Sequence, residues 1–137
     1  MRILILFVFL ALFSCKKETA QTEVMPIDIH NSQISLDVAG TYIGLIPCAD
    51  CEGISVIIIL NCDKTFELNY RYIGKSDEYF SCSGEYAWNE SGNSIILNCD
   101  NFPNFYFVGE NHLIMLDMDG NRISSELANK YILTKTE

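Results

Sequence analysis

The residues with the most distinctive chemistry are two of the six cysteines, Cys48 and Cys51, in the stretch IPCADCEG of residues 46–53. Two thiols at this spacing can close a small disulfide loop, which adds little stability through chain entropy and is often reducible. As thiolates they can instead bind a soft ion such as Cu(I). The spacing therefore predicts a redox-responsive or copper-binding pair, with a purely structural disulfide as the alternative.

Two other chemistries fit this pair less well. Zinc requires four ligands, and in the absence of a second CxxC motif Cys82 and Cys99 would have to complete the site. A thioredoxin-like enzyme activates its cysteine at a helix N-terminus, whereas Gly53 leads into ISVIIIL, which is typical of a strand. Asp50 places a negative charge beside the thiols, which opposes thiolate formation and favours the disulfide.

The remaining polar residues point to no catalytic site. The sequence has two histidines, His30 and His112, and neither belongs to a Ser-His-Asp or Cys-His pattern. Met115 and Met118 would face opposite sides of a strand, so Met115 is interpreted as a core residue. The net charge of −9 argues against a nucleic-acid partner. We therefore expect a non-enzymatic protein with no obligatory cofactor and Cu(I) as a candidate ligand.

Residues 1–15, MRILILFVFLALFSC, have the pattern of an export signal: Arg2, then an apolar run too short to span a bilayer, then a small residue before Cys15. The ending LFSC resembles the lipobox of bacterial lipoproteins. That resemblance implies removal of residues 1–14 and acylation of Cys15, which would anchor the protein in a membrane. Lys16, where inner-membrane lipoproteins usually have Asp, favours the outer membrane of a Gram-negative bacterium.

The rest of the chain divides into two parts. Residues 15–39 are polar, contain Pro26 and show no lasting period, which predicts a lipidated tether, although VMPIDIH could add an edge strand. Residues 40–137 are enough for a single core. Short segments rich in Ile, Tyr and Phe alternate there with turn sequences such as NESGN and DMDGN. The strands expected are 41–46, 54–60, 65–73, 80–88, 94–99, 104–109, 112–117 and 130–135, and SSELANK could form one helical turn.

This rhythm predicts an all-β fold, a small antiparallel barrel of eight strands in meander order, closed or nearly closed. In such a meander, the loop with Cys48 and Cys51 lies at one end of the barrel and Cys62 at the other. Cys82, at the start of its strand, and Cys99, at the end of the next, would share the end of the CxxC loop.

The hairpin FSCSGEYAWNESGNSIILNC suggests a partner for Cys82. A four-residue loop over 89–92 would close Trp88 against Asn93, and counting outward then places Cys82 opposite Cys99. An oxidising compartment favours pairing of such thiols. We predict a Cys82–Cys99 disulfide, with two buried free thiols as the alternative and Cys62 left unpaired.

The stretch GTYIGLIPCADCEGISVIIILNCDKTFEL resembles the N-terminal domain family of the copper-resistance lipoprotein NlpE. Later blocks, YIGK (72–75), GENHLIMLDMDGNRI (109–123) and YILTK (131–135), extend the resemblance over residues 40–135. Its specific element is PCADC. The positions that carry the pattern are Gly40, Tyr42, Gly44, Pro47, Cys48, Ala49, Asp50, Cys51, Gly53, Ile54, Asn61, Asp63 and Thr65.

The resemblance implies a distorted eight-stranded, lipocalin-like barrel anchored to the outer membrane. It also implies a link to copper tolerance and to envelope-stress signalling through an inner-membrane sensor kinase. The chain departs from the family pattern in having no room for a second domain and in the additional Cys62, Cys82 and Cys99.

Three functions follow, in order of preference. The first is an envelope lipoprotein whose Cys48 and Cys51 respond to redox state or copper. The second is a lipocalin-like carrier of a small apolar ligand, lined by Tyr70, Tyr72, Tyr86 and Trp88. The third is a thiol oxidoreductase.

Overall fold

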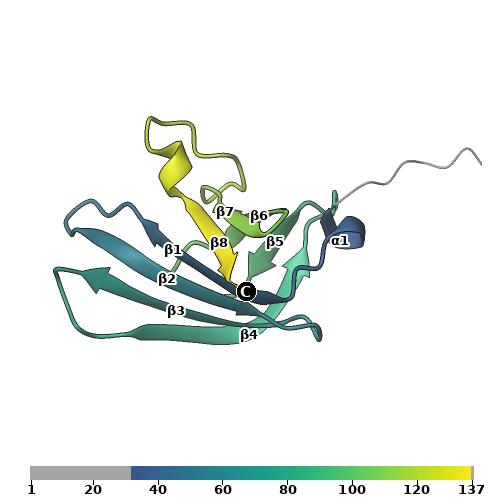
Figure 1. Ribbon diagram of the computed structural model, residues 1–137, viewed down its shortest axis with the longest axis horizontal. Coiled ribbons are helices and arrows are strands. Elements are labelled where there is room, and N and C mark those ends of the chain that lie inside the picture. Colours follow the sequence, from purple (N-terminus) through teal and green to yellow (C-terminus); the bar gives the residue numbers. More distant parts are fainter. Residues whose placement is uncertain (1–31, 137) are drawn as a thin grey trace, which may run out of the picture.

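The computed structural model describes residues 32–136. Eight antiparallel strands form a closed barrel in which each strand pairs with the next in sequence and β8 pairs with β1 (Figure 1). The predicted all-β meander is therefore confirmed. No helix among the described residues has the length and apolar character to cross a membrane. The elements are α1 (Ser32–Ser35), β1 (Gly40–Ile46), β2 (Gly53–Leu60), β3 (Thr65–Ile73), β4 (Phe80–Trp88), β5 (Ser94–Leu97), β6 (Phe105–Gly109), β7 (His112–Met115), a 3₁₀ turn (Ala128–Lys130) and β8 (Ile132–Thr136).

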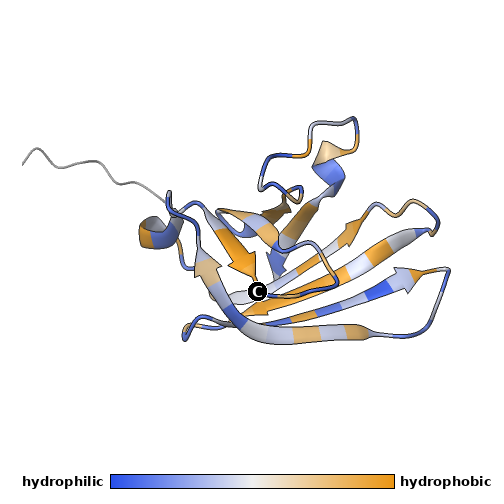
Figure 2. Ribbon diagram, turned by 180° about the vertical axis from the view of Figure 1, so that it is seen from behind, coloured by the Kyte–Doolittle hydropathy of each residue, from blue (hydrophilic) through white to orange (hydrophobic). Residues whose placement is uncertain are grey.

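Alternation along the strands fills the interior of the barrel. On β3 the predicted inward set is buried at Phe66, Leu68 and Tyr70, and only Tyr72, at the end of the barrel, is half-buried. Hydrophobic residues accordingly concentrate on the strands (Figure 2). Small barrels of this strand number hold little more than their own side chains. The largest fully buried side chains are Tyr42, Tyr106, Phe66, Ile58, Leu60, Leu68, Ile95, Leu97, Leu113, Leu133, Val56 and Val108.

Strand β4 has two halves with different partners. Its outer part, Phe80–Glu85, pairs with β3. Its last three residues, Tyr86–Trp88, pair with β5. Between β4 and β5 the ladder thus ends at the pair of Tyr86 with Leu97. The outer part of β4 is joined to β5 by no ladder, which leaves a seam in the barrel wall.

The predicted register of the β4–β5 hairpin is wrong by two residues. Trp88 lies opposite Ile95, not Asn93. The reason is Asn89, whose Oδ1 accepts the backbone N–H groups of Asn93 at 3.0 Å and Ser94 at 3.1 Å and so shapes the turn. A shift of two residues keeps every side chain on its predicted face. It does, however, remove the direct opposition of Cys82 and Cys99.

The described part of the predicted tether packs against the barrel. Leu36 and Val38 lie against the core. Ser32 Oγ donates to the Val108 carbonyl at 2.7 Å, and the Tyr42 hydroxyl donates to the Val38 carbonyl at 2.9 Å. Residues 32–39 therefore extend the barrel domain on its N-terminal side, and the rest of the predicted tether lies outside the described residues.

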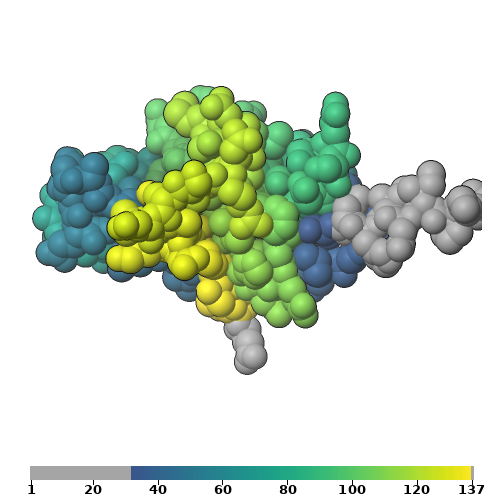
Figure 3. Space-filling model, turned by 90° about the horizontal axis from the view of Figure 1, so that it is seen from above, coloured from purple at the N-terminus to yellow at the C-terminus, as the bar shows by residue number. Residues whose placement is uncertain are grey.

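The long connection from β7 to β8, residues 116–131, lies on the outside of the barrel (Figure 3). Its predicted Asp-Gly turn is formed by Asp117, whose Oδ1 accepts the N–H groups of Asp119 at 2.9 Å and Asn121 at 2.8 Å. The 3₁₀ turn at Ala128–Lys130 occupies the place where one helical turn was expected.

Candidate functional site

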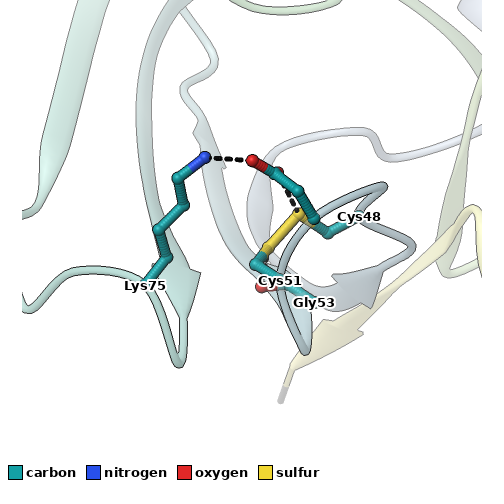
Figure 4. The surroundings of a disulfide bond; sticks show 5 residues. Cys48, Cys51, Gly53 and Lys75 are labelled. Carbon is teal, nitrogen blue, oxygen red and sulfur yellow. Dashed lines mark hydrogen bonds and ion pairs between the residues drawn. A yellow bond between two sulfur atoms is a disulfide. The ribbon is translucent and has the colours of Figure 1, made fainter.

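The CxxC motif lies in the loop of residues 47–52 that joins β1 to β2 at one end of the barrel. Cys48 and Cys51 form a disulfide with their Cα atoms 5.3 Å apart (Figure 4). Both cysteines are half-buried, and Ala49 and Asp50 between them are exposed. Two adjoining β-strands thus hold the ends of the loop, while the sulfur pair stays within reach of solvent.

The connection that follows β3 supports this loop. The Glu52 N–H donates to the Ile73 carbonyl at 3.1 Å. Next to it, Gly74 has φ +78°, and a side chain at that position would come within 2.9 Å of the Glu52 carboxyl group. Glycine is favoured at this point by its left-handed backbone conformation, whereas the exposed Glu52 carboxyl is the end of a flexible side chain and can move aside.

Lys75, in the connection after β3, also forms an ion pair with the CxxC loop. Its Nζ donates to Asp50 Oδ2 in an ion pair, drawn in Figure 4, between residues 25 positions apart. Because Lys75 donates this hydrogen bond, the pKa of the Asp50 carboxyl is lower than its usual value. Sequence reasoning missed Lys75, since no local pattern indicates a partner so far along the chain.

The charge balance at the sulfurs differs from the expectation based on Asp50 alone. Asp50 Oδ1 lies 3.6 Å from Cys48 Sγ, and the Cys51 sulfur lies 3.3 Å from the Gly53 carbonyl oxygen. The ammonium group of Lys75 partly offsets the carboxylate, so that a thiolate at Cys48 would meet less repulsion than the sequence suggested. The surroundings therefore accommodate both the disulfide and, after reduction, a thiolate pair.

The donor atoms of Cys48, Asp50 and Cys51 all lie within 4.8 Å of one another. Two sulfurs and one carboxylate are a suitable donor set for a soft ion, with the sulfurs as the principal ligands. In the structure the disulfide ties up both sulfurs, so this set is available to a metal only after reduction.

The other cysteines are placed away from this loop. Cys82 and Cys99 form a second disulfide, with Cα atoms 6.1 Å apart. Cys82 lies opposite Leu68, five residues along β3 from Ile73, or about 17 Å. Among the described cysteines only Cys62 is free; it is exposed in the β2–β3 turn at the other end of the barrel. A zinc site completed by Cys82 and Cys99 therefore does not form, and the two disulfides do not lie side by side.

The aromatic residues expected to line a carrier site pack against other side chains instead. Tyr70 and Tyr86 are buried, and Tyr72 and Trp88 are half-buried. The Tyr70 ring stacks on Phe102, with centroids 4.3 Å apart, and on Phe80 at 5.2 Å. This arrangement fills the interior at that end of the barrel, which favours the CxxC loop over the interior as the functional site.

Comparison with known proteins identifies the family. The sequence profile described as the NlpE N-terminal domain matches residues 42–126, which include the whole CxxC loop and its Lys75 support. The chain belongs to this family. The curated relative Lipoprotein NlpE of Escherichia coli strain K12 is 33% identical over 84 residues, which are 61% of this chain and 36% of that protein. The matched segment thus spans about a third of that relative.

Two solved structures are also similar. The crystal structure of a putative lipoprotein from Shewanella oneidensis shares 44% identity and a TM-score of 0.71, covering 77% of this chain and 95% of that one. The crystal structure of the Cpx pathway activator NlpE from Escherichia coli shares 30% identity and a TM-score of 0.49, covering 64% and 46%. The predicted acylation site, Cys15, lies outside the described residues.

Proposed function

We propose that this protein is a lipid-anchored envelope lipoprotein, without enzymatic activity, that links copper and redox conditions to envelope-stress signalling. The observation that carries the proposal is the half-buried disulfide of Cys48 and Cys51 at the end of the barrel, beside the ion pair of Asp50 and Lys75. The loop is accessible and supported by neighbouring strands, and it presents a soft donor set once its disulfide is reduced.

Reduction is the step that creates the site. A dithiol reductant transfers two electrons and two protons to the disulfide and is itself oxidised to a disulfide. The two thiols then lose their protons as they bind Cu(I), since the thiolate is the ligand. Cys48 and Cys51 would hold the ion. Asp50 contributes little to binding because a carboxylate is a poor Cu(I) ligand.

Anchoring at Cys15 and a location in the outer membrane follow from the residues of the N-terminus and from the lipobox resemblance. A lipid anchor would keep the barrel at the membrane surface, and the acidic chain would not bind anionic headgroups itself. Replacement Cys15→Ser is expected to release the protein from membranes into the soluble envelope fraction. Continued membrane association of that variant would contradict the anchor.

Membership of the NlpE N-terminal domain family supports a role in envelope-stress signalling. The resemblance of the PCADC loop to that family is what suggests an inner-membrane sensor kinase as partner. In cells that depend on this protein, Cys48→Ser and Cys51→Ser should each reduce copper tolerance and abolish the response of an envelope-stress reporter to copper. Cys62→Ser is the matched control and should leave both unchanged. Equal copper responses in all three variants would rule out the CxxC loop as the responsive element.

A further inference from the structure

The second disulfide lies beside a part of the barrel wall where two neighbouring strands are not paired. The β4–β5 ladder ends at the pair of Tyr86 with Leu97, and the outer part of β4 has no ladder partner on that side. Cys82 lies on this outer part, and Cys99 lies just beyond the end of β5. The Cys82–Cys99 bond therefore crosses the seam that the backbone hydrogen bonds leave open.

The bond also fastens a loop. Residues 98–104 connect β5 to β6, and this loop (the β5–β6 loop) is closed at its base by a hydrogen bond from the Leu97 N–H to the Asn104 carbonyl at 2.8 Å. Among the backbone hydrogen bonds of residues 32–136, none joins residues 100–103 to the barrel. Apart from its base, the loop is held by the disulfide at Cys99 and by the Phe102 ring.

Phe102 covers the end of the barrel interior. The residue is 8% exposed, and its ring stacks on that of Tyr70 with centroids 4.3 Å apart. At the base of the loop, Asn104 Oδ1 is buried without a hydrogen-bond partner among the described residues. Once the covalent bond is gone, the contact of Phe102 with Tyr70 is what remains to hold the loop beyond its base.

A reductant can reach the bond from outside. An open pocket of about 340 Å³ lies against it, lined by Tyr70, Phe80, Ser81, Cys82, Ser83, Cys99, Asp100 and Asn101. Cys82 is half-buried, whereas Cys99 is 5% exposed. A thiolate would therefore attack Cys82 Sγ, and the Cys99 thiolate would leave.

We propose that the Cys82–Cys99 disulfide is a redox switch: when oxidised it holds the β5–β6 loop closed over Tyr70, and its reduction releases the loop. A dithiol reductant breaks the bond in two steps. Its first thiolate forms a mixed disulfide with Cys82 and releases Cys99, which takes up a proton. Its second thiol then displaces Cys82, and the reductant leaves as a disulfide. The freed loop moves away and uncovers the rings of Tyr70 and Phe102.

This device is independent of the copper chemistry proposed for the CxxC loop, so a matched variant can separate the two. Amide exchange and ring contacts are measured by NMR on the full chain carrying Cys48→Ser and Cys51→Ser, before and after reduction. Reduction should make the Leu97 amide exchange at least tenfold faster and abolish the nuclear Overhauser contact between the rings of Tyr70 and Phe102. The β2–β3 amides should remain protected, which serves as the internal control for folding.

The full chain carrying Cys82→Ser and Cys99→Ser should show the open behaviour with or without reductant, and the dye ANS should bind it more strongly than the oxidised parent protein. If that variant does not fold, the NMR comparison before and after reduction of the chain carrying Cys48→Ser and Cys51→Ser still tests the proposal. Unchanged Leu97 exchange and an intact Tyr70–Phe102 contact after reduction would overturn the proposal. So would equal loss of protection throughout the barrel, because that would show general unfolding and not the release of one loop.

Discussion

At the scale of single residues, two buried tyrosines differ in whether the hydroxyl group has a hydrogen-bond partner. The Tyr42 hydroxyl donates to the Val38 carbonyl at 2.9 Å, whereas the hydroxyl of the fully buried Tyr106 has no hydrogen-bond partner. Burial raises the pKa of Tyr42 to about 12 and also raises that of Tyr106. Tyr106 is thus expected to occupy its site mainly for the volume of its ring.

We predict that Tyr106→Phe leaves the free energy of unfolding within about 0.5 kcal/mol of the parent value or raises it, because no hydrogen bond is lost. Tyr42→Phe, the matched control, should cost about 1 kcal/mol through the lost bond to Val38. Urea denaturation measures both. A loss well above 1 kcal/mol for Tyr106→Phe would contradict the prediction and would indicate a buried water at its hydroxyl.

Lys75 stabilises the charged form of Asp50 in the CxxC loop. Because its hydrogen bond favours the charged carboxylate, the pKa of Asp50 is lower in the folded than in the unfolded protein. The pair therefore stabilises the fold above the unfolded pKa of Asp, about 4, and this contribution is lost as the pH falls through the folded pKa. Lys75→Met should raise the pKa of Asp50 toward its ordinary value, as followed by carboxyl NMR titration. Lys130→Met is the control, and an unchanged Asp50 titration in Lys75→Met would disprove the pairing.

At the scale of elements, local patterns predicted the strands and their meander order, with the ends of β3 and β4 as observed, but not every other strand end or the register of the β4–β5 hairpin. Alternation on β3 is a property of neighbouring residues, so its inward face was predictable. The strand expected at 94–99 ends at Leu97, because the Cys99 N–H turns back to the Leu97 carbonyl at 3.0 Å. The hairpin register depended on whether Asn89 extends the strand or shapes the turn, and its side-chain hydrogen bonds decide for the turn.

The turn role of Asn89 gives an element-scale prediction. Asn89→Ala removes the acceptor for two backbone N–H groups and should lower the free energy of unfolding by about 1–2 kcal/mol. Ser91→Ala, which removes a hydroxyl from the exposed part of the same turn, should cost less. Chemical denaturation of both variants tests this, and equal losses would show that the turn does not depend on the Asn89 carboxamide.

The two disulfides are expected to differ in their contribution to stability. Cys82 and Cys99 are 17 positions apart, and Cys48 and Cys51 only 3. By loop-closure entropy the longer loop is worth about 3 kcal/mol and the shorter about 2 kcal/mol. Replacing Cys82 and Cys99 by serine should therefore lower the urea midpoint of unfolding more than replacing Cys48 and Cys51. The opposite order would mean that the CxxC loop has a larger structural role than the one proposed.

At the scale of the whole molecule, sequence reasoning brought Cys48 and Cys51 to one end of the barrel and Cys62 to the other, because a meander fixes which turns share an end. It could not supply Lys75 or Gly74, which reach the CxxC loop from the far side of the β2–β3 hairpin. It also placed Cys82 too close to the CxxC end, because β4 begins opposite Tyr70, three residues before the end of β3 at Ile73. The result is a barrel with two separate redox positions, one open at a loop and one across a seam.

Cys48 and Cys51 are proposed to bind Cu(I) only when they are reduced. The direct test is an anaerobic Cu(I) titration, against a competing chelator, of the oxidised and reduced full chain carrying Cys62→Ser, Cys82→Ser and Cys99→Ser, with Cys48→Ser and Cys51→Ser each added in turn. We predict that reduction adds one Cu(I) ion that is lost in both variants, and that the oxidised protein gains none at this loop. Equal binding in the two redox states, or binding in the reduced state that survives Cys48→Ser and Cys51→Ser, would contradict the account.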